Sequence, residues 1–321
     1  MLADQKKIYA AINIGTLKVK SLFAYFEGDE MTPLFQSNNL TCFGCGMFEH
    51  GNQILDENLA ATIKEILLLK EKVKEYNCQI VRLFATHALR DAANQKAVVD
   101  KIKERTGYEV EIIGPKEEGE LYFRAAVSDL PAHQNFVIAD IGGGSCQILI
   151  GDKDRLVSDY SFKTGAQFLH ESFTTDPHNA QSLTSEQDLQ KMREYLIKEY
   201  SILPVNLGFP LIYGSSNIID LMKTLKIPLE PYPDSHDHPY KVQAAYLSNF
   251  ISEIIKFPYQ TREEKYPFQT GYMWGVDKSF LNITTLAERF ASPYILPSNA
   301  NIVQGFLYKI KAEIDNKIID S

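Results

Sequence analysis

The sequence predicts an α/β protein built from two related domains, and three observations lead to this prediction. The chain has 321 residues, about twice the length of an average domain, and 45% of them are apolar. Between residues 80 and 127, segments with strand patterns alternate with segments of helical periodicity. The pattern of Ala10–Thr16 then recurs at Val137–Gly143. A second copy of the opening indicates a second domain of the same type.

The first half of the chain contains both strand and helix patterns. Strands are expected at Ile8–Ile14, Lys20–Phe26, Ile80–Ala85 and Val110–Ile113, and helices at Asp56–Tyr76, Ala88–Arg105 and Glu117–Val127. The first two strands would form a hairpin, and Asp56 would cap the first long helix. That helix is amphipathic, so we expect it to pack on a sheet.

The second half starts again after a polar segment at Leu130–Asn135. Strands are expected at Phe136–Ile141, Cys146–Ile150 and Pro210–Tyr213, and helices from a capping box at Thr184–Gln187 to about Tyr200, at Ile218–Leu225 and at Ala300–Ile319. The first domain is therefore expected to span residues 1–130, with the helix of 300–321 packing back on it. The second domain would span residues 131–299.

The repeated segment carries a polar residue just before a glycine turn. Asn13 in the first copy corresponds to Asp140 in the second. Glycine turns let backbone N–H groups approach an anion closely. A third strand leads into Gly214–Asn217, another turn of small residues before a helix. These turns predict phosphate-binding loops, and two facing copies predict a cleft between the domains.

Composition excludes several other classes of protein. The net charge of −8 argues against a nucleic-acid partner, because no general positive field is present. No apolar stretch approaches the roughly 20 residues of a membrane span, and the apolar run near the N-terminus is too short for a signal peptide. Four cysteines in so long a chain do not form a disulfide framework. We therefore expect a cytoplasmic protein with reduced cysteines and no membrane partner.

Two short motifs allow metal or redox chemistry but favour simpler interpretations. Cys42 and Cys45 have CxxC spacing, yet a zinc site needs a second ligand pair. His236, Asp237 and His238 lie in a proline-rich segment that we expect to be a solvated surface loop.

Three segments in a fixed order carry a family resemblance. They are Phe84–Asn94, Ile112–Glu120 and Ile138–Ser145. In these segments the chain resembles the exopolyphosphatase / guanosine pentaphosphate phosphohydrolase family of the actin-like ATPase superfamily. The resemblance extends to four shorter segments, at Tyr9–Thr16, Ser161–Ala166, Tyr213–Asn217 and Ser298–Gly305.

The resemblance implies two ribonuclease-H-like domains with the active site between them. It also implies hydrolysis of terminal phosphoanhydride bonds in polyphosphate or guanosine pentaphosphate. The expected partner is then a phosphate-containing small molecule or short polyphosphate, and a homodimer is plausible for this family.

Individual residues match the family's functional positions. Glu118 would orient and deprotonate the attacking water, and Arg90 would stabilise charge on the transferring phosphoryl group. Asp140 would hold Mg²⁺ directly or through water. The phosphate-binding residues would be Gly15, Thr16, Lys18, Gly142, Gly143, Gly144, Ser145, Gly214, Ser215 and Ser216.

The chain departs from the family pattern at two carboxylate positions, where it has Asn13 and Gln147. Each change removes a negative charge, so we expect Mg²⁺ to bind weakly. If Lys18 faces the site, its ammonium partly replaces the charge of the metal. Glu120 stands where the family has an arginine, and Cys42 falls near another family arginine. The loss of these positive charges argues against efficient processing of long polyphosphate.

Two other functions fit the same residues. A phosphate- or nucleotide-binding sensor would keep the loops and lose the chemistry. A sugar-kinase-like phosphotransferase would share only the superfamily. A sensor should bind its ligand without metal, whereas the hydrolase should hold a dication between Asp140 and phosphate.

Overall fold

The computed structural model describes two compact units. Described residues are 6–128, 130–132, 134–215, 217–233, 235–269 and 271–319. Unit 1 takes in the chain up to Leu121 and again from Ile302 onward, and unit 2 runs from Tyr122 to Asn301. The chain leaves unit 1 within helix α4 (Pro115–Val127) and returns at helix α11 (Ile302–Ile319). Unit 2 is therefore an insertion into unit 1.

Unit 1 is built on a five-stranded sheet of order β3-β2-β1-β4-β5. Its strands are β1 (Ile8–Ile14), β2 (Lys18–Glu27), β3 (Glu30–Leu40), β4 (Ile80–Ala85) and β5 (Val110–Ile112). The first three strands pair antiparallel, and β4 and β5 run parallel to β1. A hairpin meander thus continues into a parallel half-sheet.

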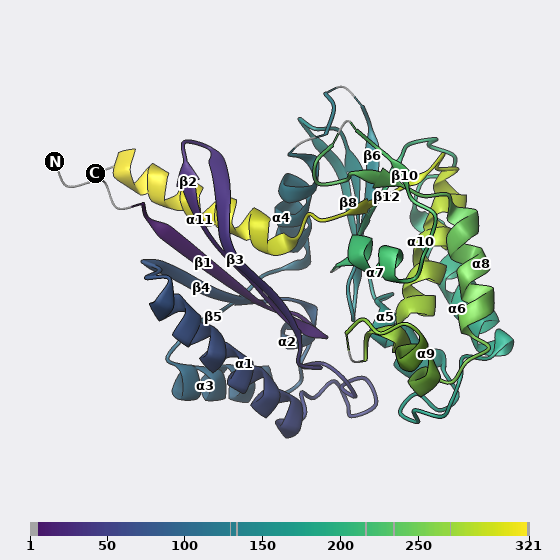
Figure 1. Ribbon diagram of the computed structural model, residues 1–321. Helices are drawn as coiled ribbons and strands as arrows, with labels where there is room; N and C mark the ends of the chain where they lie inside the picture. The colour runs from purple at the N-terminus through teal and green to yellow at the C-terminus, as the bar shows by residue number, and fades with distance from the viewer. Residues whose placement is uncertain are drawn as a thin grey trace. The chain divides into compact units, whose positions relative to one another are not determined.

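Helices cover both faces of this sheet (Figure 1). They are α1 (Asp56–Glu75), α2 (His87–Arg90) and α3 (Gln95–Thr106), together with α11. Alternating residues such as Ile12, Ile14 and Val19 form one core with α1 and α3. On the other face Phe84 of β4 stacks on Phe306 of α11, with ring centroids 4.0 Å apart. The sheet of unit 1 is complete only when α11 is in place.

Gly305 allows α11 to approach α4 closely within unit 1. A Cβ atom at this position would lie 1.9 Å from the carbonyl oxygen of Leu121. Any side chain would therefore force the two helices apart, which is the physical reason for a glycine here.

Unit 2 has a second sheet, of order β12-β9-β6-β7-β8. Its strands are β6 (Phe136–Ile141), β7 (Cys146–Gly151), β8 (Leu156–Phe162), β9 (Leu211–Gly214) and β12 (Ile295–Ser298). Three strands again pair antiparallel and two run parallel to the central β6. The order and the directions repeat those of unit 1, so the recurring sequence pattern corresponds to a structural repeat.

The helices of unit 2 surround a nearly buried central helix. They are α5 (Ala166–Phe173), α6 (Glu186–Glu199), η1 (Tyr200–Ile202), α7 (Ile218–Thr224), α8 (Ala244–Ile254), α9 (Tyr259–Lys265), η2 (Tyr272–Trp274) and α10 (Val276–Phe290), with a small ribbon of β10 (Glu230–Pro231) and β11 (Tyr240–Lys241). The central helix is α10, of which nearly every residue is buried among α5, α6 and α8.

A buried charge cluster sits at the start of α10. Asp277 pairs with Arg262 at 3.2 Å and with Lys278 at 3.0 Å, and all three side chains are fully buried. Thr184 donates to Asp277 and accepts from Lys278, each over 2.6 Å. Burial alone would raise the pKa of Asp277, but the two cations outweigh it and hold that pKa at about 2. Burial lowers the pKa of Lys278 to about 8.

Several helix boundaries differ from the sequence predictions. The helix predicted from Ala88 to Arg105 is interrupted, because the Asn94 amide bonds both the N–H and the carbonyl of Ile54. Asp56 is the first residue of α1 and does not cap it, since the N-cap position is Leu55.

The predicted capping box is displaced by one residue. It consists of Ser185 and Asp188, because Thr184 is bound within the buried charge cluster. The edge strands β3 and β8 were not predicted at all.

The histidine segment is also different from its prediction as a solvated loop. His238 is fully buried, and its Nε2 lies 2.7 Å from the carbonyl oxygen of Ala126, whereas His236 is exposed. Across the described ranges, no three His, Cys, Asp or Glu side chains gather closely enough to hold a metal ion. The same ranges contain no helix with the length and apolar character needed to cross a membrane.

Candidate active site

The first loop of unit 1 is a tight turn between β1 and β2. The Gly15 N–H donates to the carbonyl of Lys18 over 3.0 Å and closes the turn. The carbonyls of Thr16 and Leu17 accept hydrogen bonds from residues 41–44, which fixes the turn from outside. Thr16 and Lys18 are each only 5% exposed. Three predicted phosphate-binding residues therefore lie in one well-held turn.

The second loop, between β6 and β7 of unit 2, repeats this turn. The Gly142 N–H donates to the carbonyl of Ser145 over 2.9 Å. The carbonyls of Gly142, Gly143 and Gly144 accept hydrogen bonds from backbone N–H groups of residues 165–168, at the start of α5. The structure thus anchors the glycine run through its oxygen atoms.

This anchoring decides where the N–H groups of the second loop point. In a trans peptide the N–H points away from the carbonyl of the same unit. The N–H groups of Gly143, Gly144 and Ser145 therefore point away from α5. Successive N–H groups turned to one side create a partial positive charge suited to an anion. A Cβ at Gly165 would lie 2.4 Å from the Gly143 carbonyl, so glycine is needed there too.

The third loop follows β9 of unit 2. Gly214 lies beside Asp140 in the parallel register of β9 and β6. A Cβ on Gly214 would lie 2.2 Å from the hydroxyl oxygen of Tyr122, which leaves no room for a side chain. Ser215 lies within 3.5 Å of the Tyr272 hydroxyl. The third member of this predicted loop, Ser216, lies outside the described residues.

Glu118 and Arg90 meet within unit 1. Arg90 Nη1 donates to Glu118 Oε2 over 2.8 Å and to the carbonyl of Ile113 over 3.0 Å. The Glu118 side chain is 8% exposed and that of Arg90 16%. Arg90 Nε also lies 3.5 Å from Asp91 Oδ1. The arginine thus holds the glutamate in one position, and its contact with a transferring phosphoryl group stays a prediction.

Asn13 and Gln147, the two amides expected at carboxylate positions of the family, are both buried. Gln147, 1% exposed, donates through Nε2 to the hydroxyls of Ser145 and Ser161 over 3.2 and 3.3 Å. Asn13 is 2% exposed, and its Nδ2 has no hydrogen-bond partner among the residues that the structure describes. An unsatisfied buried donor costs about 1–3 kcal/mol, so this group needs a ligand or another explanation.

Asp140 and Gln147 of unit 2 could hold Mg²⁺ only together with the phosphate oxygens of a bound substrate. Asp140 lies opposite Gln147 across β6 and β7, so a carboxylate faces an amide and not a second carboxylate. Magnesium is commonly held by one or two carboxylates plus substrate phosphates. Asp140 fits that use, but this donor set is not a preformed metal cage.

Sequence reasoning missed three residues near these positions. Tyr122 is fully buried against Gly214, and its pKa lies well above the usual range because of burial and the nearby Asp140 charge. Lys20 stands directly opposite Asn13 across β1 and β2. Asp91 touches Arg90. Each depends on strand register or helix packing, for which no local pattern in the sequence gives a signal.

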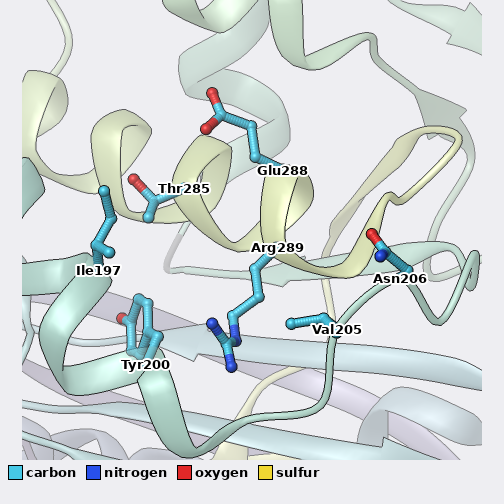
Figure 2. Close-up of a pocket in the computed structure, with 7 residues that line it drawn as sticks. All are labelled: Ile197, Tyr200, Val205, Asn206, Thr285, Glu288 and Arg289. Carbon is cyan, nitrogen blue, oxygen red and sulfur yellow. The ribbon is translucent and has the colours of Figure 1, made fainter.

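A cavity of about 410 Å³ opens elsewhere in unit 2, at the ends of α6 and α10. Figure 2 shows Arg289 between Tyr200 and Val205 in this cavity. The Arg289 guanidinium donates to the carbonyls of Ser201 and Leu203, so it fastens the η1 segment to α10. None of the predicted site residues lines this cavity.

Comparison with known proteins decides the family. The model of the Ppx/GppA phosphatase family matches residues 23–266. The chain belongs to the Ppx/GppA phosphatase family. Members of this family are phosphatases that generally use divalent metal ions. Family membership supports hydrolysis of the exopolyphosphatase or guanosine-pyrophosphatase kind.

Two curated relatives illustrate the range of the family. Exopolyphosphatase 2 of Mycobacterium tuberculosis is 26% identical over 273 residues, covering 82% of this chain and 84% of that protein. A guanosine-5'-triphosphate,3'-diphosphate pyrophosphatase of Vibrio parahaemolyticus is 21% identical, covering 70% of this chain but only 45% of that protein.

A solved structure shows the fold. The exopolyphosphatase from Cytophaga hutchinsonii superposes with a TM-score of 0.81 at 20% identity, over 95% of this chain and 97% of that chain. The predicted α/β fold class is therefore confirmed. The predicted cleft between the domains stays a prediction.

Proposed function

We propose that this chain hydrolyses the terminal phosphoanhydride bond of a short phosphate-containing substrate, with Glu118 as the general base. The pairing of Glu118 with Arg90 is the observation that supports this most directly. A buried carboxylate held at one oxygen by a guanidinium, at 2.8 Å, has a fixed direction. A general base must be fixed in this way so that its oxygen lies within hydrogen-bond reach of the attacking water when the proton is transferred.

The reaction that we propose is an attack of water on the terminal phosphorus. A new bond forms between the water oxygen and phosphorus, and the bond from phosphorus to the bridging oxygen breaks with its electron pair. The water proton passes to the Glu118 carboxylate. The shortened phosphate chain leaves with its new terminal oxygen negatively charged.

The backbone of the second loop would bind the phosphate groups. The N–H groups of Gly143, Gly144 and Ser145 are turned to one side by the hydrogen bonds of their neighbouring carbonyls. They can donate to the oxygens on which charge collects. Mg²⁺ bound to Asp140 and the substrate would supply further positive charge.

The substrate is proposed to be short. Glu120 is exposed and pairs with Lys116 at 3.8 Å, so it offers no positive charge to a distal phosphate. Cys42 adopts a left-handed backbone conformation with φ of 51° and likewise carries no cation. A long polyanion would therefore lack a cationic contact at each of these two positions.

The test is phosphate release from tripolyphosphate and guanosine pentaphosphate with Mg²⁺, comparing wild type, Glu118→Gln and Glu120→Gln. Glu120→Gln is the matched control, because it removes an exposed carboxylate on the same helix. We expect Glu118→Gln to lose at least about 100-fold in rate and the control to stay within about twofold. Equal rates in all three proteins would contradict the assignment of the base.

Absence of release from the wild type would favour the sensor alternative. The restored variant Asn13→Asp/Gln147→Glu distinguishes the cause. If release appears only in this variant, the two amides suppress the chemistry of an otherwise complete site.

A further inference from the structure

The turn between β1 and β2 carries an unusual set of side chains on one face of the sheet. Asn13 pairs with Lys20 in the antiparallel register, and Lys18 lies two residues before Lys20 on the same strand. Side chains two residues apart on a strand, and those of a cross-strand pair, point to the same face. The three side chains therefore share one face, opposite to the apolar residues Ile14 and Val19.

This face is sealed from water on its inner side. Phe84 lies beside Asn13 in the register of β1 and β4, and its ring stacks on Phe306 of α11 at 4.0 Å. Asn13 is only 2% exposed as a result, and Lys18 only 5%. Burying the Asn13 amide N–H without a hydrogen-bond partner in the described part of the chain is costly. A ligand oxygen at this position would satisfy that N–H.

We infer that this turn is an oxyanion site in which the Asn13 amide and the Lys18 ammonium bind a phosphoryl group without a metal ion. The inference rests on the proposed function for the identity of the natural ligand, a phosphoanhydride. The Nδ2 of Asn13, which lacks a partner within the described residues, donates to one ligand oxygen. Lys18 supplies the positive charge that a dication would otherwise bring.

The electrostatics of Lys18 agree with an anion site. Burial and the neighbouring Lys20 charge lower the pKa of Lys18 to about 7. A bound oxyanion would favour the ammonium form and relieve the repulsion between the two lysines.

An aspartate at position 13 would give the turn the opposite property. It would attract a dication and would pair with Lys18 and Lys20 when no metal is present. The amide therefore decides between a site for a metal and a site for an anion. Asn13 and Lys18 act together, because an aspartate would neutralise the lysine that the anion needs.

The experiment is calorimetric titration of the full-length protein with tripolyphosphate in EDTA at pH 6.5. Wild type is compared with Lys18→Met, Lys18→Arg and Asn13→Asp, and with Lys96→Met as control, because the Lys96 side chain is 91% exposed. We expect wild type and control to bind equally, and Lys18→Met to bind at least about tenfold more weakly, a loss of about 1.4 kcal/mol. Lys18→Arg should retain part of the affinity.

Asn13→Asp gives the sharper outcome. We expect weak binding in EDTA and recovery when Mg²⁺ replaces EDTA. The inference is overturned if wild type binds tripolyphosphate only with Mg²⁺, or if Lys18→Met binds as tightly as wild type in EDTA. Thermal melting of each variant confirms that it is folded.

The two proposals fail separately. Metal-free binding without any hydrolysis would retain the anion site and remove the hydrolase function. Hydrolysis that depends on Glu118, together with binding that requires Mg²⁺, would retain the function and remove the anion site.

Discussion

The two glycine turns have the same backbone and opposite charges. In unit 1 the Gly15 N–H closes on Lys18 over 3.0 Å, and in unit 2 the Gly142 N–H closes on Ser145 over 2.9 Å. The turn of unit 1 has two lysines near an amide, whereas that of unit 2 has an aspartate opposite an amide. The peptide geometry therefore sets the turn, and the side chains set the charge of the ligand that suits it.

The next strand in each sheet shows a second difference. Asn13 stands beside Phe84 on β4, whereas Asp140 stands beside Gly214 on β9. In unit 1 an aromatic ring closes the space next to the turn. In unit 2 the ring of Tyr122 enters the space that the glycine leaves. Asn13 is buried whereas Asp140 is half-buried, and only unit 2 depends on a missing side chain.

The largest expected effect tests that dependence. Gly214→Ala should lower the free energy of unfolding by about 2–3 kcal/mol, because the new Cβ would lie 2.2 Å from the Tyr122 hydroxyl. Gly114→Ala is the matched control, since no atom lies within 4 Å of its added Cβ. Urea denaturation measures both. Equal midpoints for the two variants would show that Tyr122 moves aside freely.

A smaller effect concerns the buried lysine of unit 1. The pKa of Lys18 is about 7 in the folded chain and about 10.4 when unfolded, so the unfolded state binds more protons between these values. The free energy of unfolding should therefore rise with pH, by about 2 kcal/mol from pH 7 to pH 9 for this residue alone. Denaturation at several pH values measures the slope.

The control for this prediction is Lys18→Met. Its slope should be smaller than that of wild type but not zero, because the pKa of Lys278 is also lowered, to about 8. Identical slopes in both proteins would mean that Lys18 is solvated. The comparison between the two turns would then lose its basis.

The smallest effect exchanges the charges of the two turns. Gln147→Glu places a second carboxylate opposite Asp140 and should lower stability by about 0.5–1 kcal/mol without metal, a loss that Mg²⁺ restores. Asn13→Asp places a carboxylate opposite Lys20 and should raise stability by a similar amount without metal. Thermal melting with and without Mg²⁺ measures both. Shifts of the same sign would refute the charge contrast.

Part of this architecture could be predicted from the sequence because its signals are local. The strand, polar residue and glycine of each turn recur in one short pattern, which placed Asn13 and Asp140 at equivalent positions. The edge strands β3 and β8 gave no such signal, because their residues are mostly exposed or half-buried and form no apolar run.

Other features depend on contacts between distant residues. Arg90 and Glu118 are 28 residues apart, and only the packing of α2 against the start of α4 brings them together. Charged residues are seldom buried, so nothing in the sequence indicates that Arg262, Asp277 and Lys278 lie in the core, where they pair with one another. The register between strands decides which residues face Asn13, and no single segment of the sequence predicts that register.

The path of the chain has a consequence for its synthesis. Unit 2 lies between the strands of unit 1 and the helix α11 that covers one face of those strands. A ribosome makes the five strands of unit 1 first, then all of unit 2, and α11 last. The ring of Phe84 therefore has no stacking partner until Phe306 has been translated, and more than half of the chain is made between these two residues. The first sheet to be synthesised is thus covered by its last helix only after unit 2 has been made.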